Sequence, residues 1–258
     1  MNVLFSIYAF IFGCLVGSFL NVVILRLPKQ QDLVFKRSHC PVCGNQLKWF
    51  HNIPVLSFLF LRGKCAFCGT RISWRYPLIE LLTGIIAFWL LPDEFTSMSI
   101  GLFLFYFLIA CIFICHLFID LDHHLLLDSL NIYLIAIVLP YVLIMHHWSY
   151  WVIGGLIGFG GPLLVTWLFY KLRGQIGLGG GDIKLYGILG MLLGPKMIVG
   201  TIFFSCFLGA LIGVILILSK KMNKDHPMAF GPYIILVGSF QIYFSTLAEK
   251  VQFLIFGI

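Results

Sequence analysis

The feature that most constrains this chain is a series of long apolar runs. They reach roughly the length that crosses a bilayer, and they cover residues 3–25, 77–92, 98–119, 129–146, 150–170, 183–194, 197–218 and 229–247. Of the 258 residues, 60% are hydrophobic and only 10% are charged, whereas a soluble domain carries about a quarter charged residues. The sequence therefore predicts an all-α polytopic membrane protein with about eight transmembrane helices.

The first run has no basic segment before it and no small-residue cleavage site after it. A secretory signal peptide carries both of these features. We therefore expect residues 1–25 to form a retained first transmembrane helix.

One long polar segment, residues 26–76, follows this first helix. It carries nine Lys and Arg residues, Lys36 among them, against a single acid, Asp32. Because cytoplasmic loops of membrane proteins carry the excess of Lys and Arg, we expect a cytoplasmic domain here and a seven-helix membrane domain over residues 77–258. The net charge of +7 is explained in this way, without nucleic-acid binding.

The same charge rule orients the rest of the chain. Alternating eight helices puts residues 120–128, 171–182 and 220–224 on the cytoplasmic side, and Lys221 and Lys224 add to the basic balance there. Two acid clusters, one around Asp120 and one at Asp182, then fall on the same face.

Four cysteines stand together in the polar segment as two Cys-x-x-Cys units, separated by 21 residues. The units are Cys40 with Cys43 and Cys65 with Cys68, and a glycine follows each of them. Two such turns complete a tetrahedral zinc site with four thiolate ligands. A segment of this size has few residues that could form a hydrophobic core, so a bound metal would be needed to stabilise its fold. We therefore expect the zinc to be structural. Reduced or redox-active cysteines are the alternative.

A glycine-rich bend precedes Asp182 at the start of an apolar run. Gly179, Gly180 and Gly181 stand directly before the acid, and small residues there leave room for an extended substrate backbone. Free N–H groups at a helix start stabilise an ionised carboxylate. An ionisable group at a membrane-embedded helix end is costly, which indicates a functional role.

The second acid cluster follows the apolar run over residues 98–119 without a break. Asp120 stands at the end of that run, where the negative end of the helix dipole disfavours a carboxylate unless function requires it. We interpret Asp122 and Asp128 as ordinary helix-end or N-cap residues with a structural role. Asp120 and Asp182 are therefore the candidates for a pair that works as general base and general acid.

With these motifs, essentially the whole chain resembles the type IV prepilin peptidase family, bifunctional membrane aspartic proteases of the GxGD class. The segments that carry the resemblance are 17–24 with 26–28, 40–68 including Asn52-Ile53-Pro54, 76–84, 119–120, 179–184 and 230–232.

This resemblance implies a reaction. Asp120 and Asp182 match the two catalytic aspartates of the family. The implied substrates are prepilins or pseudopilins of type IV pili, type II secretion or competence systems, whose basic leader is cleaved at the cytoplasmic face of the bacterial inner membrane. The second implied activity is N-methylation of the new N-terminal residue with S-adenosylmethionine, for which the chain shows no independent donor-site motif.

Two further charged residues are candidates for supporting roles. Glu80, early in a span, is placed to pair with Arg75 or Lys184 or to contact the substrate amine. Lys184 is placed to keep Asp182 ionised, or else to extend from the helix end toward water.

Three alternatives remain open at this point. They are a GxGD peptidase without methyltransferase activity, a membrane-anchored zinc module that only scaffolds an assembly machine, and a transporter that uses its carboxylates as a proton relay. A relay predicts acids near the middle of spans and a repeated half, whereas the acids here stand at span ends and the two halves do not match.

Overall fold

The computed structural model describes residues 3–35, 37–175, 177–220 and 228–256. Lys36, Lys221 and Lys224, on which part of the charge argument depends, lie outside the described residues. The described chain is helical and contains only two isolated β-bridges, His39 with Gln46 and Lys64 with Arg71. The all-α prediction is confirmed.

The chain forms two compact units, Met1–Cys115 and His116–Ile258. The first holds α1 (Val3–Arg26), η1 (Leu27–Lys29), η2 (Trp49–Asn52), α2 (Leu56–Phe60), α3 (Arg75–Leu90) and most of α4 (Ser97–His123). The second holds the end of α4 and then α5 (Asp128–Met145), α6 (Trp148–Arg173), α7 (Gly180–Leu218), α8 (Gly231–Tyr243) and α9 (Ser245–Phe256).

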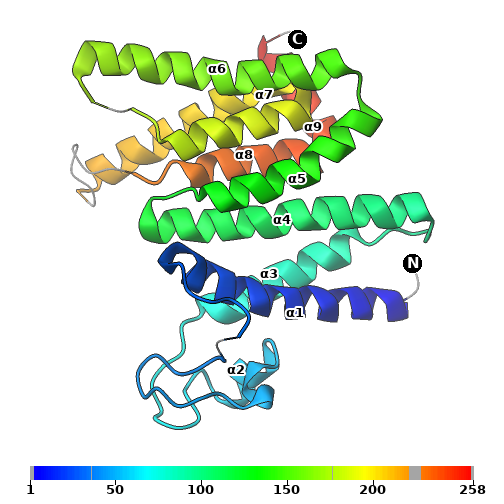
Figure 1. Ribbon diagram of the computed structural model, residues 1–258, viewed down its shortest axis with the longest axis vertical. Coiled ribbons are helices and arrows are strands. Elements are labelled where there is room, and N and C mark those ends of the chain that lie inside the picture. Colours follow the sequence, from blue (N-terminus) through cyan, green and yellow to red (C-terminus); the bar gives the residue numbers. More distant parts are fainter. Residues whose placement is uncertain (1–2, 36, 176, 221–227, 257–258) are drawn as a thin grey trace. The chain divides into compact units, whose positions relative to one another are not determined.

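In the first unit, α1 and α3 pack through small residues (Figure 1). A Cβ on Gly13 would stand 2.6 Å from the Thr83 carbonyl oxygen, and one on Gly17 would stand 2.8 Å from the Cα of Glu80. The two backbones therefore approach closely, as small residues allow between membrane helices. The polar segment 26–76 leaves this pair at the end of α1 and returns at the start of α3.

In the second unit, α7 is two antiparallel helices and not one straight rod. The Tyr186 hydroxyl lies 2.5 Å from the Ser205 hydroxyl, although 19 residues of straight helix would separate them by about 28 Å. The chain reverses at Gly194, whose φ is 76°, and Pro195 follows. The Tyr150 hydroxyl donates to the Leu193 carbonyl at 2.6 Å, next to this break. Figure 1 shows α7 running out and back.

Five helices of the described chain are long and apolar enough to span a membrane by length and composition, or six if the bent pair α8–α9 is one span. This count takes α7 as a single helix and omits α3, which has only 16 residues. The two halves of α7 correspond to the runs expected over 183–194 and 197–218. The chain is thus a multi-pass membrane protein. The apolar run over 229–247 was expected to form one transmembrane helix. In the structure α8 ends at Tyr243, and the chain bends by 110° between α8 and α9.

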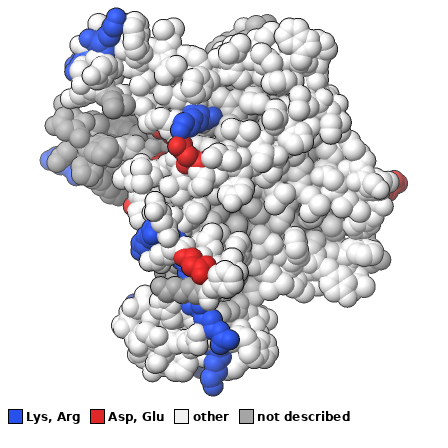
Figure 2. All heavy atoms as spheres, viewed as in Figure 1, with Lys and Arg blue, Asp and Glu red and all other residues white. Residues whose placement is uncertain are grey.

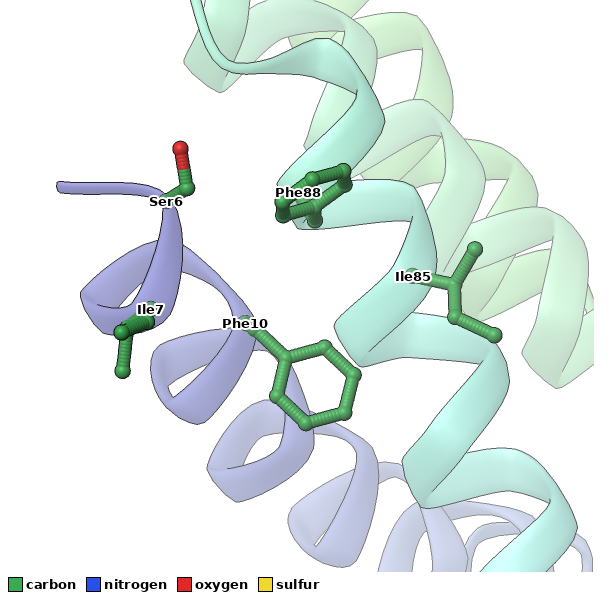
Figure 3. Close-up of a pocket in the computed structure, with 5 residues that line it drawn as sticks. All are labelled: Ser6, Ile7, Phe10, Ile85 and Phe88. Atoms are coloured by element: carbon green, nitrogen blue, oxygen red, sulfur yellow. The ribbon is translucent and has the colours of Figure 1, made fainter. Parts of the chain in front are cut away.

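On the face that Figure 2 shows, charged side chains are few and most of the surface is uncharged, as lipid contact requires. An apolar hollow of about 350 Å³ lies between α1 and α3, with Phe10 on one side and Ile85 and Phe88 on the other (Figure 3). No ionisable side chain lines this hollow, so it offers no group for acid–base chemistry.

Candidate active site

Asp120 lies in the last turn of α4 and is only 4% exposed. Its Oδ2 accepts a hydrogen bond of 2.9 Å from the backbone N–H of Gly231. Gly231 is the first residue of α8, so its N–H has no partner within its own helix and is free to bind an anion. The positive end of one helix therefore offsets the unfavourable position of Asp120 at the negative end of another.

Asp182 lies in the first turn of α7, as the position after three glycines predicts. Its Oδ2 accepts a hydrogen bond of 3.2 Å from the N–H of Gly179, the N-cap residue. Asp120 and Asp182, 62 positions apart in the sequence, both stand at helix ends of the second unit.

The glycines beside Asp182 serve mainly close packing. A Cβ on Gly181 would stand 2.7 Å from the Leu126 carbonyl oxygen, and one on Gly179 would stand 2.9 Å from Oδ2 of Asp182 itself. Only Gly180 of the three faces open space within 4 Å. We expected all three glycines to leave room for a substrate, but in the structure only Gly180 does so.

Leu126 lies against the starts of the two helices that neighbour the acids. The loop between α4 and α5 brings it against both Gly181 and Gly231, where a Cβ would stand 3.1 Å from a Leu126 methyl group. The first turn of α7, which carries Asp182, and the first turn of α8, which binds Asp120, therefore both lie against one leucine. Carboxylates are groups that can work as general acid and general base.

The four cysteines of the first unit form a second site. The Sγ atoms of Cys40, Cys43, Cys65 and Cys68 all lie within 4.8 Å of one another. A hydrogen bond with the Thr70 hydroxyl lowers the pKa of Cys68 to about 6, and the backbone N–H of Cys43 lowers the pKa of Cys40. Against a backbone hydrogen bond from Asn45, burial and the neighbouring thiols raise the pKa of Cys43 to about 11. The arrangement of the four sulfur atoms itself fits a closed tetrahedral zinc site.

The comparisons with known proteins cover both units. Residues 11–93 match the family model described as the bacterial peptidase A24 N-terminal domain, and residues 102–214 match the type IV leader peptidase family. The chain is 35% identical over 238 residues to a prepilin leader peptidase/N-methyltransferase of Myxococcus xanthus (89% of this chain, 70% of the relative). It is 35% identical over 254 residues to one of Xanthomonas campestris (88% and 86%) and 32% identical over 266 residues to one of Pseudomonas aeruginosa (91% and 88%). The chain belongs to the type IV leader peptidase family. No solved structure matches it.

Two supporting residues of this leader peptidase have partners other than those expected. Lys184 makes an exposed ion pair of 2.7 Å with Asp128 rather than with Asp182. Asp128 is the first residue of α5, and the N-cap position belongs to Leu127. Asp128 is therefore a helix-end residue that pairs with Lys184 and does not cap α5.

Glu80 connects the cysteine segment of the leader peptidase to its membrane helices. The buried carboxylate accepts a 2.7 Å hydrogen bond from the N–H of Val55. Val55 has a φ of 61°, a rare conformation for a β-branched residue. The Glu80 carboxylate thus connects α3 to the segment through the Val55 N–H, a backbone partner that the sequence did not suggest.

Sequence reasoning missed two features of the leader peptidase site. In the sequence, Gly231 is part of the motif Phe230-Gly231-Pro232, to which no function was assigned. The proline at the second position of α8 is a typical helix-start signal, and it could have indicated that the Gly231 N–H is free to bind an acceptor. His116, one turn before Asp120, is fully buried beside Asn131 of α5, and the polar side-chain atoms of both lack hydrogen bonds among the described residues. No sequence pattern marks that pair.

Proposed function

We propose that this chain is a prepilin leader peptidase with N-methyltransferase activity. It cleaves the basic leader of type IV prepilins or pseudopilins and methylates the new N-terminal residue with S-adenosylmethionine. Membership in the leader peptidase family and the names of the relatives support this reaction. The observation that supports the peptidase half is the placement of both acids beside Leu126: the Gly231 N–H donates to Asp120, and Leu126 lies against both Gly231 and Gly181, the residue before Asp182.

In this proposal the two aspartates are the catalytic pair. One carboxylate takes a proton from water, and the resulting hydroxide attacks the scissile carbonyl carbon. The other, protonated, gives its proton to the carbonyl oxygen, and the tetrahedral intermediate then breaks down as the amine leaves with a proton. The pair titrates as a unit, so the two tasks belong to the pair and exchange between the carboxylates during the cycle.

The site faces the cytoplasm of a bacterial cell in this proposal. The excess of Lys and Arg in residues 26–76 supports that orientation of the inner-membrane protein. The basic leader of a prepilin stays on this side, so its cleavage point reaches the helix ends that carry the aspartates.

Zinc has a structural task in this proposal. Cys40, Cys43, Cys65 and Cys68 hold the ion and leave it no open position. S-adenosylmethionine supplies the methyl group when it is bound. We propose the division of the chain into a first helix (1–25), a zinc-binding domain (26–76) and a seven-helix peptidase domain (77–258) on the same basis.

Mass spectrometry of a type IV prepilin tests both activities. The detergent-solubilised protein and S-adenosylmethionine are incubated with the prepilin, and we expect loss of the leader and gain of one methyl group. Loss of the leader without the methyl group would leave a peptidase and refute the transferase half. If the folded protein leaves several different prepilins uncleaved, the proposal is contradicted and the proton-relay alternative is favoured again.

A further inference from the structure

The cysteine segment exposes large apolar side chains although it is the most polar part of the described chain. Phe60 is 82% exposed and Trp49 is 79% exposed, and Leu56 and Leu59 are exposed as well. These side chains stand on η2 and α2, which contact each other. We call Trp49, Leu56, Leu59 and Phe60 the apolar edge of the segment.

Basic residues flank the apolar edge on both sides. Lys48 precedes it and lies 5.8 Å from the ring centre of Phe50, and Arg62 and Lys64 follow it in exposed positions. Asp32 is the one acid of the segment, and two backbone N–H groups, of Val34 and Phe35, already donate to its carboxylate. Aromatic and aliphatic side chains bordered by cations are typical of protein surfaces that lie in the headgroup layer of an anionic membrane.

The anchor at Glu80 fixes the depth of this edge. α3 has 16 residues and is therefore about 24 Å long, shorter than the hydrocarbon core of about 30 Å. The first turns of α3 therefore lie within the bilayer or at its headgroup layer, and they do not extend beyond the headgroups into water. Glu80 stands in the second turn of α3 and binds the N–H of Val55, the residue directly before α2. This bond holds α2 at the level where α3 enters the bilayer.

We propose that the apolar edge docks into the anionic phospholipid leaflet around α1 and α3, with Lys48, Arg62 and Lys64 on the phosphates. The cysteine segment is then an interfacial domain and does not stand free in the cytoplasm. This inference does not depend on the proposed function.

Charge favours anionic lipid over two basic protein surfaces as the occupant of this edge. A second copy of this segment is equally basic. The leader of the proposed prepilin substrate is basic too. Each of these would repel Lys48, Arg62 and Lys64, whereas an anionic headgroup attracts them.

Photo-crosslinking in nanodiscs tests the proposal. Benzoylphenylalanine replaces Phe60 in the full chain, and the matched control carries it at Phe58, a buried neighbour on the same short helix that packs against Trp74. Zinc content shows that the segment folds in both variants. We expect a phospholipid adduct at position 60, several-fold more abundant with phosphatidylglycerol than with phosphatidylcholine alone, and only internal crosslinks at position 58.

Other crosslinks would overturn the proposal. Adducts from position 60 to residues 116–258, to a second copy or to an added prepilin would identify a protein surface as the occupant. The absence of any adduct at position 60, while position 58 reacts, would show a free surface in water. A double change, Arg62→Gln with Lys64→Gln, should lower the lipid adduct several-fold, and an unchanged yield would contradict the role given to charge.

Discussion

Replacing Gly231 with alanine is the sharpest perturbation that the structure offers. The added Cβ would stand 2.7 Å from Oδ2 of Asp120 and 3.1 Å from a Leu126 methyl group, where ordinary contacts begin at 3.4 Å. Gly231 has no positive φ, so alanine suits the backbone and the clash with the carboxylate is the main effect. The carboxylate has to move about 0.7 Å, which is the difference between the 2.7 and 3.4 Å separations.

The size of the effect follows from this displacement. A misplacement of about 1 Å in a catalytic group costs about 10²-fold in rate, so we expect Gly231→Ala to lower kcat roughly 10- to 100-fold. That loss corresponds to about 1.4 to 2.7 kcal/mol in the activation barrier. The KM for prepilin should change less than kcat, because the added methyl group acts on the catalytic acid.

Initial rates of prepilin cleavage measure this effect. Gly160→Ala in α6 is the matched control, because a Cβ there meets nothing within 4 Å. Thermal unfolding of both variants separates a loss of catalysis from a loss of folding. If Gly231→Ala cleaves as fast as the parent protein, the reasoning about Asp120 fails.

Three further predictions concern the supporting residues. Cys43→Ser should lower the zinc content per protein, measured by atomic absorption, and should make residues 26–76 more susceptible to proteolysis. An unchanged zinc content would refute the four-thiolate site. Glu80→Ala should destabilise the protein by about 1–3 kcal/mol, because it leaves the Val55 N–H unpaired, and Glu80→Gln should recover much of this in thermal unfolding; equal losses would contradict the hydrogen-bond account. Lys184→Gln should change stability by less than about 1 kcal/mol and leave cleavage near the parent rate, since its exposed partner is Asp128; a large loss of cleavage would restore a role beside Asp182.

The helices and the cysteine site follow from local sequence. Long apolar runs fix where membrane helices form, and Gly194 with Pro195 marks the break that divides α7 into its two expected halves. Each short Cys-x-x-Cys turn brings its own two sulfur atoms together, and the pairing of two such motifs predicts that all four meet at one point, as they do. The bend between α8 and α9 could not be read in the same way, because an apolar run gives a length and no direction.

The partners of buried polar groups depended on packing between distant segments. Asp120 and Asp182 were recognisable because a carboxylate at a membrane helix end is costly. The Gly231 N–H on Asp120 and the Val55 N–H on Glu80 join residues 111 and 25 positions apart. Backbone donors carry no residue identity, so composition and spacing cannot reveal such bonds.

The central claim is that Asp120 and Asp182 act as one catalytic pair. The most direct test measures single-turnover cleavage of a prepilin by Asp120→Asn, Asp182→Asn and the double variant, with Asp122→Asn as the neighbouring control. We predict that either single change abolishes cleavage, that the double change is no worse than either one because the residues work as a unit, and that Asp122→Asn keeps cleaving. Cleavage that survives in Asp120→Asn or Asp182→Asn, or that fails in Asp122→Asn alone, would contradict the account.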